Sequence, residues 1–374
     1  MTLASERQEL ILAAVRERGT VRLADLVARL GVTAVTVRRD VTILADRGLV
    51  QRVHGGVTQP HRAQPPEQRA LATSSPFGRP PGQALVGMVV PTVEFYWPPV
   101  IQGAQSAVAA AGGRLALRGS AYDAAEDRRQ VSALLDRGAR TLLIAPTTTG
   151  EAGLDLLRWL GGLTVPVLLV ERLPPPALPT LPLDAVTTAH SLGAGLAVRH
   201  LVTLGHHRIA FITARFSPTT KALLEGWRET VASLGLPGSE DLEFDVPAYG
   251  SPGWADAYDA VLRRCQDAGV TALFVHSDRE AIGLTERARD RGLTVPDDLA
   301  VVSYDDEVAA ASDPPLTAVR PPKHRLGSVA AEMALARMAD PAERPVHRVQ
   351  LWPTLVVRAS CGAPGPLRHQ PTGN

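Results

Sequence analysis

Two neighbouring arginines in the first fifty residues have the chemistry of nucleic-acid recognition. Arg38 and Arg39 stand among apolar residues spaced three and four apart, Val37, Val41 and Leu44, and this spacing predicts a helix with one buried stripe and a polar outer face. Arginines near a helix N-terminus can bind phosphates or the acceptor edge of guanine, and threonines can contact the backbone or a thymine methyl. We therefore expect DNA contacts from this helix and the segment after it, at Thr33, Val35, Thr36, Arg38, Arg39, Thr42, Arg52 and His54.

Two residues of this region allow more than one interpretation. Asp40 stands closer to the apolar stripe than to the outer face, which favours a structural role, such as pairing with an arginine or fixing the turn, over contact with a base. His54 fits a phosphate contact and ordinary turn chemistry equally well.

The surrounding elements complete a helix-turn-helix with a wing. Ser5 and Gln8 have the spacing of a capping box at the start of a first helix. A second helix is predicted next, and Gly31 begins the short turn into the third helix, which Thr33 is expected to cap. Residues 49–56 then alternate between apolar and polar types and end in two glycines, as a small β-wing would.

Residues 5–57 resemble DeoR-type winged helices. The resemblance is carried by the motif TVRRD at residues 36–40 and the motif RVHGG at residues 52–56. It implies a DNA-binding domain over residues 1–57, in which the third helix reads base edges in the major groove and the wing lies on phosphates.

Charge is distributed unevenly along the chain. The 374 residues carry a net charge of +1, yet residues 1–84 hold an excess of five positive charges and the remainder an excess of four negative charges. The basic excess coincides with the predicted DNA-binding domain. No charged leader followed by an apolar segment and no apolar run long enough to cross a membrane is present, so we expect a cytoplasmic protein with no membrane partner.

Metal and redox chemistry have little support in the sequence. Cys265 and Cys361 stand alone, without zinc-type spacing or an even framework of disulfides. Glycine-rich phosphate motifs and nucleophile-elbow motifs are also missing, so we expect no metal, no cofactor and no catalysis.

Proline marks the boundary of the first domain. Residues 58–84 contain six prolines among polar residues, which is typical of a linker that separates two modules. Residues 363–374 are expected to form a disordered tail.

Apolar strand-like runs alternate with amphipathic helices from residue 85 onwards. The runs lie at residues 84–90, 141–145, 165–170, 209–212, 272–275 and 299–302, with a helix near 99–111 after the first of them. Repeated βα units of this kind predict parallel sheets covered on both faces. The expected α/β fold therefore has two doubly wound lobes with a cleft between them.

Residues 85–362 resemble the effector-binding domain of LacI/GalR-type repressors, which is itself similar to periplasmic sugar-binding proteins. The motifs are LGHHRIA at 204–210, HSDREAIG at 276–283, VPDDLAVVSYDD at 295–306, PPLTAVR at 314–320 and PTLVVR at 353–358. The resemblance implies one lobe at about 85–184 and 314–342 and the other at about 185–313 and 343–362. Three crossovers between the lobes would then form a hinge.

The resemblance also implies an effector in the cleft, where a sugar needs an aromatic platform and paired polar groups. The residues it indicates are Tyr96, Trp97, Glu171, Arg172, Ser217, Thr219 and Asp278. We expect Phe95 to pack in the core. For Glu171 and Arg172 the alternative is an ion pair that bridges the lobes.

Two departures from the family affect the expected control of DNA binding. The family commonly has a ligand-gripping arginine where this chain has Leu223, and Lys221 is a candidate replacement, although an ammonium cannot reproduce a planar guanidinium. The family's hinge helix, which enters the minor groove, has no match in the linker. We expect control through the spacing of two DNA-binding heads in a homodimer.

The expected function is therefore that of a sequence-specific transcriptional regulator, a repressor of carbohydrate uptake or catabolism that binds a two-fold operator and a small sugar. A nucleoside or another non-sugar effector remains an alternative, because the clamp is missing. An exported solute receptor shares the two-lobed fold but does not account for the winged helix.

Overall fold

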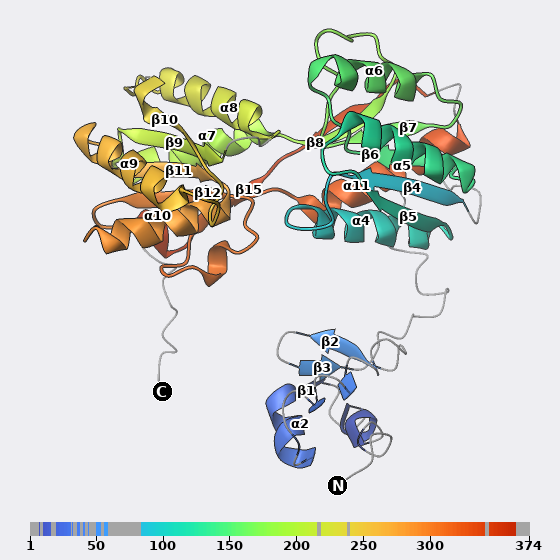
Figure 1. Cartoon of the computed structure of the whole chain (residues 1–374), viewed down its shortest axis with the longest axis horizontal. Helices are drawn as coiled ribbons and strands as arrows, with labels where there is room; N and C mark the ends of the chain where they lie inside the picture. Colours follow the sequence, from blue (N-terminus) through green and yellow to red (C-terminus); the bar gives the residue numbers. More distant parts are fainter. Residues whose placement is uncertain are drawn as a thin grey trace, which may run out of the picture. The chain divides into compact units, whose positions relative to one another are not determined.

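The computed structural model describes most of the C-terminal three quarters of the chain and part of the N-terminal quarter. The described residues are 84–214, 218–237, 240–340 and 344–363, together with 7, 10–15, 20–30, 32, 36–37, 40–41, 44, 50–53 and 56–58. Two compact units divide the chain at Ser74, and each is described by itself (Figure 1). The expected linker and tail, residues 58–84 and 363–374, lie outside the described residues apart from 58, 84 and 363.

The N-terminal unit combines helices with a small antiparallel sheet. Residues 10–15 are helical, α2 spans Leu23–Leu30, and the described residues between 36 and 44 are helical as well. The strands are β1 (Thr20–Arg22), β2 (Gln51–Val53) and β3 (Gly56–Thr58), in the order β1-β3-β2. The hairpin of β2 and β3 confirms the predicted wing, whereas the sequence pattern did not reveal β1.

Apolar packing holds this unit together as the helical spacing predicted. Val37, Val41 and Leu44 are each at most 2% exposed and pack with Ile11 and Leu26. Buried side chains from three helical segments therefore form one small core.

The structural interpretation of Asp40 is confirmed. Its side chain is buried, and Oδ2 accepts a hydrogen bond from Nε of Arg7 at 2.9 Å. Asp40 thus ties the third helical segment to the first.

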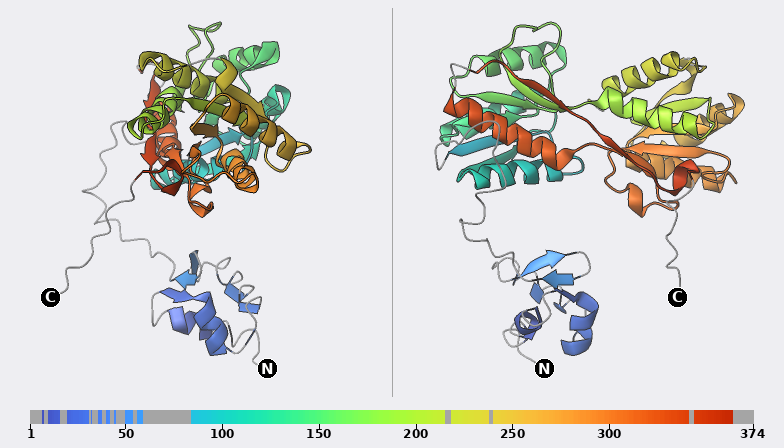
Figure 2. Two further views of the ribbon diagram at one scale, coloured as in Figure 1. Left: turned by 90° about the vertical axis from the view of Figure 1, so that its left-hand side faces the viewer. Right: turned by 180° about the vertical axis from the view of Figure 1, so that it is seen from behind.

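The first lobe of the large unit is a six-stranded parallel sheet in the order β14-β8-β7-β6-β4-β5. Helices α4 and α11 pack on one face, and α5 and α6 cover the other (Figure 2). The strands are β4 (Leu85–Val90), β5 (Arg114–Gly119), β6 (Thr141–Ile144), β7 (Val167–Val170), β8 (Asp184–Thr188) and β14 (Arg348–Leu351). The helices are α4 (Trp97–Ala110), α5 (Ala124–Asp136), α6 (Gly150–Gly161) and α11 (Lys323–Ala339).

The second lobe repeats this architecture with the order β10-β9-β11-β12-β13-β15. Its edge strand β15 pairs antiparallel with β13, while the other pairs are parallel as predicted. The strands are β9 (Ile209–Ala214), β10 (Glu243–Val246), β11 (Ala272–His276), β12 (Ala300–Tyr304), β13 (Thr317–Arg320) and β15 (Thr354–Val356). The helices are α7 (His190–Thr203), α8 (Thr220–Ser233), α9 (Trp254–Asp267) and α10 (Asp278–Asp290), with 3₁₀ turns at Glu240–Leu242, Ala309–Ala311 and Ala359–Cys361.

The lobe boundaries differ from the predicted ones. Strand β8 pairs in the first sheet before the chain crosses near residue 189, β13 pairs in the second sheet before the crossing near 321, and β14 pairs in the first sheet before the crossing near 352. Each predicted boundary, at 184, 313 and 342, therefore falls five to ten residues too early. The reason is that a strand must pair within its own sheet before the chain can leave that lobe.

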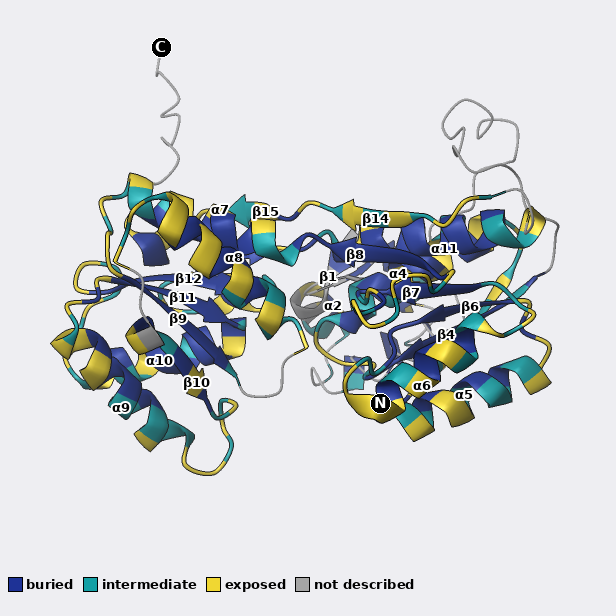
Figure 3. Ribbon diagram, turned by 90° about the horizontal axis from the view of Figure 1, so that it is seen from above, coloured by how far each residue is buried: buried dark blue, intermediate teal, exposed yellow. Residues whose placement is uncertain are grey.

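The strands are largely buried and the helices turn exposed faces outward (Figure 3), and glycines let α4 and α11 of the first lobe pack closely. A Cβ atom at Gly103 of α4 would lie 1.9 Å from the carbonyl oxygen of His324, and one at Gly327 of α11 would lie 1.9 Å from that of Val100. The two helices can therefore pack backbone to backbone over the first sheet. No helix among the described residues is long and apolar enough to cross a membrane.

Candidate functional site

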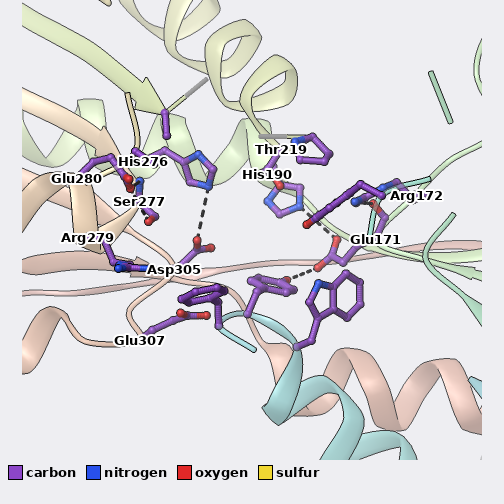
Figure 4. A pocket seen from close by; sticks show the side chains of 17 residues that line it. Glu171, Arg172, His190, Thr219, His276, Ser277, Arg279, Glu280, Asp305 and Glu307 are labelled. Carbon is purple, nitrogen blue, oxygen red and sulfur yellow. Dashed lines mark hydrogen bonds and ion pairs between the residues drawn. The ribbon is translucent and has the colours of Figure 1, made fainter. Parts of the chain in front are cut away.

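A cavity of about 450 Å³ lies between the two lobes, and loops at the carboxyl ends of the parallel strands line it (Figure 4). The first lobe and its crossover contribute Phe95, Tyr96, Trp97, Tyr122, Glu171, Arg172 and His190. The second lobe contributes Ala214, Pro218, Thr219, Ala248, His276, Ser277, Arg279, Glu280, Asp305 and Glu307. The carboxyl edge of a parallel sheet is where ligands bind in open α/β folds.

Glu171, the first residue after β7, is held by hydrogen bonds on both carboxylate oxygens. Oε1 accepts from the hydroxyl of Tyr96 and from Oγ1 of Thr188 at 2.6 Å. Oε2 accepts from the backbone N–H of Thr188 at 2.9 Å and lies 3.2 Å from Nε2 of His190. The acceptor capacity of this carboxylate is therefore largely used within the protein.

Electrostatics match this arrangement. Burial alone would raise the pKa of Glu171, but the nearby imidazole of His190 and the hydrogen bonds from Thr188 outweigh it and lower the pKa to about 2. Burial and the adjacent carboxylate raise the pKa of Tyr96 well above its ordinary value. Glu171 is therefore an anion and Tyr96 a neutral hydrogen-bond donor at neutral pH.

Two side chains at the crossovers connect the lobes at the cavity. His190 contacts Glu171 of the first lobe through Nε2, while its Nδ1 lies 2.7 Å from the hydroxyl of Tyr304 in the second lobe. Lys323 lies 5.1 Å from the ring centroid of Tyr96 and donates to Glu307 of the second lobe at 3.2 Å. A change in the angle between the lobes must therefore change these contacts.

Asp305, the first residue after β12, is the acidic group of the second wall. Its Oδ2 lies 3.5 Å from Nε2 of His276, and the structure gives it no other side-chain bond among the described residues. Burial would raise the pKa of Asp305, but the hydrogen bond to His276 and the positive charge of Lys323 lower it. Asp305 therefore presents an ionised carboxylate with spare acceptor capacity to the cavity.

Asp278 is a correction to the predicted site, because it does not line the cavity. It is 2% exposed, and its carboxylate accepts from Oγ of Ser303 at 2.6 Å and from the backbone N–H groups of residues 307–309 at 2.5, 3.0 and 3.2 Å. Its role is to fix the loop that carries Asp305. The rule that ligands bind after strand ends also applied to Asp305, and this signal could have identified it.

The aromatic residues after β4 divide their roles differently from the prediction. Phe95, expected in the core, is 54% exposed, whereas Trp97 touches the cavity but is only 3% exposed and packs in the first lobe's core. Tyr96 lies between these extremes, with its hydroxyl on Glu171. The difference arises because Trp97 begins α4, whose inner face packs on the sheet.

The remaining predicted contacts separate into three groups. Arg172 and Thr219 line the cavity, and Nη1 of Arg172 donates to the carbonyl oxygen of Glu171 at 2.7 Å. Lys221 does not line it: its side chain is 85% exposed and its Nζ lies 3.9 Å from Glu225. Ser217 lies outside the described residues.

Leu223 confirms the missing clamp. The side chain is fully buried in the core of the second lobe, so a polar ligand has no access to it. Lys221 does not compensate for this loss in the structure, since it pairs on the outer surface.

Most predicted DNA contacts cannot be placed. Thr33, Val35, Arg38, Arg39, Thr42 and His54 lie outside the described residues. Arg52 belongs to β2, and Thr36 is helical and half-buried.

The N-terminal fold and the interlobe cavity together define a class of protein, a DNA-binding head joined to a two-lobed receptor of the periplasmic-binding-protein type. Residues 7–63 match the family described as a DeoR-like helix-turn-helix domain, and residues 198–361 match the family described as a periplasmic binding protein-like domain. The chain is 30% identical to the HTH-type transcriptional regulator reg1 of Streptomyces lividans, over 92% of this chain and 98% of that protein.

Two further comparisons agree. The ribose operon repressor of Escherichia coli K12 is 28% identical over 74% of this chain and 81% of its own length. The crystal structure of a LacI family transcriptional regulator from Mycobacterium smegmatis superposes with a TM-score of 0.60 at 29% identity, covering 74% of this chain and 98% of that one. The chain belongs to the LacI family of transcriptional regulators, and it carries a DeoR-like DNA-binding head. It is a regulator and not an enzyme.

Proposed function

We propose that this regulator is a repressor whose affinity for operator DNA is controlled by a small carbohydrate bound between the lobes. The observation that carries the proposal is the pairing of Asp305, a carboxylate with spare acceptor capacity, with aromatic rings in one cavity. Carboxylates accept hydrogen bonds from sugar hydroxyls, and aromatic rings cover the apolar faces of sugar rings. One relative is a ribose operon repressor, which supports the same class of effector.

The geometry suggests how the effector acts. A sugar that contacts Asp305 in one lobe and Arg172 in the other gains most when the lobes are close, so it favours the closed arrangement. Closure changes the crossover contacts of His190 and Lys323. In a homodimer it would alter the spacing between two DNA-binding heads, each reading one half of a two-fold operator in the cytoplasm.

The head's contacts remain those predicted from the sequence. Arg38 and Arg39 are proposed to read bases, with Thr33, Val35, Thr36 and Thr42 around them and with Arg52 and His54 on phosphates. If Arg39 reads a guanine, Arg39→Ala should cost about 1–3 kcal/mol of DNA-binding free energy.

The test combines DNA selection with effector titration. Purified full-length protein is used to enrich genomic fragments, and its affinity for the selected operator is then measured by fluorescence anisotropy with sugars, sugar phosphates, polyols and nucleosides. We expect one carbohydrate to change the operator dissociation constant. Asp305→Asn should raise the carbohydrate concentration needed for that change by about ten- to a hundredfold while leaving DNA affinity intact. An effect restricted to nucleosides, or one that is unchanged in Asp305→Asn, would refute the carbohydrate assignment.

A further inference from the structure

Two of the aromatic side chains that line the cavity are exposed to solvent. Phe95 is 54% exposed and Tyr122 is 50% exposed, and both line the cavity. Their backbones have φ angles of 55° and 58°, a region that residues other than glycine rarely adopt. The fold therefore holds two large apolar surfaces toward water beside the ligand cavity, an arrangement that marks a binding surface.

Exposure separates these platforms from the polar end of the cavity. Glu171 is 8% exposed and the side chain of His190 is 11% exposed, whereas Phe95 and Tyr122 are at least half exposed. The two groups also come from different strands of the first lobe, because Tyr122 follows β5 and Phe95 follows β4, while Glu171 follows β7 and His190 follows β8. The cavity lining therefore runs from a buried polar end to an exposed aromatic rim.

Each platform also has an arginine near it. Cζ of Arg279, on α10 of the second lobe, lies 5.2 Å from the ring centroid of Phe95. Arg172 lines the same cavity as Tyr122. A planar guanidinium beside an aromatic ring offers hydrogen-bond donors to the hydroxyls of a ring stacked on the aromatic face.

We infer that the effector is an oligosaccharide of at least two rings, with one ring near Asp305 and Tyr96 and the next on the platforms of Phe95 and Tyr122. This inference rests on the proposed carbohydrate function and specifies its ligand. The buried Leu223 agrees with it, because the second lobe lacks the inner cationic clamp and binding must draw on contacts further out.

A rival role for Phe95 is a latch, since its contact with Arg279 joins the two lobes. A latch would affect all effectors alike, because closing the lobes is common to every ligand. A platform would affect only ligands long enough to reach it. Tyr122 has no such contact across the lobes among the described residues, so the two aromatic residues together distinguish the roles.

The experiment is a chain-length series on the full-length protein by isothermal titration calorimetry. The probes are glucose with maltose, maltotriose, cellobiose and cellotriose, xylose with xylobiose, and galactose with lactose. We expect at least one disaccharide to bind at least about tenfold more tightly than its own monosaccharide. Tyr122→Ala and Phe95→Ala should each weaken that disaccharide by about tenfold and change the monosaccharide by less than about twofold.

Leu196→Ala is the matched control, because this side chain is 39% exposed on α7 and does not line the cavity; it should leave both dissociation constants unchanged. A monosaccharide that binds as tightly as its oligosaccharides would overturn the inference and leave the proposed carbohydrate function standing. Equal losses for both lengths in Tyr122→Ala would also overturn it. No binding of any probe would overturn the inference, while the operator titration above decides the proposed carbohydrate function separately.

Discussion

The two walls of the cavity contain similar groups in different states of hydrogen bonding. Glu171 in the first lobe and Asp305 in the second each follow a strand, have a positive φ angle and contact a histidine. Both oxygens of Glu171 are engaged by the protein, whereas Asp305 contacts only His276 among the described side chains. A carboxylate at a strand end therefore stabilises the cavity wall when the protein occupies its acceptors, and it can bind a ligand when they are spare.

Asp278 extends this comparison within the second lobe. Four donors surround its carboxylate, and the loop it fixes presents Asp305. Asp278, whose acceptors are occupied, thus supports Asp305, whose acceptors are spare. Substitutions of fully hydrogen-bonded carboxylates should therefore affect mainly stability, and substitution of Asp305 should affect mainly effector binding.

Glu171→Gln tests the first-lobe wall of the cavity, where the protein occupies the carboxylate, and should have the largest effect on the free energy of unfolding. With its pKa lowered from 4.5 to about 2, the ionised carboxylate should contribute on the order of 3 kcal/mol to the free energy of unfolding at pH 7. Because the folded-state pKa is depressed, this contribution is complete above pH 4.5 and is lost as the pH falls toward 2. Urea unfolding of the wild type and of Glu171→Gln should show a difference in the free energy of unfolding that decreases as the pH falls from 4.5 toward 2. If this difference is absent at pH 7, or stays constant down to pH 2, the ionised carboxylate of Glu171 does not stabilise the fold as proposed.

Asp305→Asn tests the second-lobe wall, where the carboxylate has spare acceptor capacity. We expect effector affinity to fall by about ten- to a hundredfold, because a hydrogen bond to a charged group is worth about 1.5–3 kcal/mol. Stability should change less than in Glu171→Gln, because the protein itself uses little of this carboxylate. Calorimetry with the sugar that releases operator DNA gives the first quantity, and urea unfolding gives the second. If Asp305→Asn lowers the free energy of unfolding by more than it lowers the free energy of effector binding, Asp305 serves the fold and not the ligand.

His190→Asn removes the side chain that contacts both lobes. Its imidazole connects Glu171 to Tyr304, so we expect the free energy of unfolding at pH 7 to fall by about 1–2 kcal/mol. His207→Asn provides a control on the exposed surface of the second lobe. Equal stability of the two variants in urea would show that the bridge adds nothing to cohesion between the lobes.

The sequence predicted the architecture well, because buried strands and amphipathic helices carry periodic signals. The runs at 141–145 and 272–275 became β6 and β11, and the predicted wing contains the paired strands β2 and β3. Lobe boundaries were wrong by five to ten residues, since pairing at sheet edges depends on strands distant in sequence.

The site was predicted less completely. The predicted residues Tyr96, Trp97, Glu171, Arg172 and Thr219 line the cavity, whereas Asp278 does not. Asp305, which the sequence analysis did not single out, lines it instead. Both aspartates follow apolar strands in the sequence, and only the fold shows that backbone N–H groups of the next loop surround Asp278. The sequence also did not show that Phe95 is exposed and Trp97 buried, because the exposure of these two side chains depends on how α4 packs on the sheet.

The smallest expected effect belongs to Lys221→Ala, which tests whether the second wall regains its missing clamp. The Lys221 side chain is 85% exposed and pairs with Glu225 on its own helix, and such surface pairs contribute about 0.5 kcal/mol or less. We therefore expect stability and effector affinity to stay within about twofold of wild type. Glu225→Ala is the matched control, since it breaks the same pair from the other side. A tenfold loss of affinity in Lys221→Ala alone would mean that this ammonium turns toward the effector when the lobes close, and the second wall would then hold a cation as well as a carboxylate.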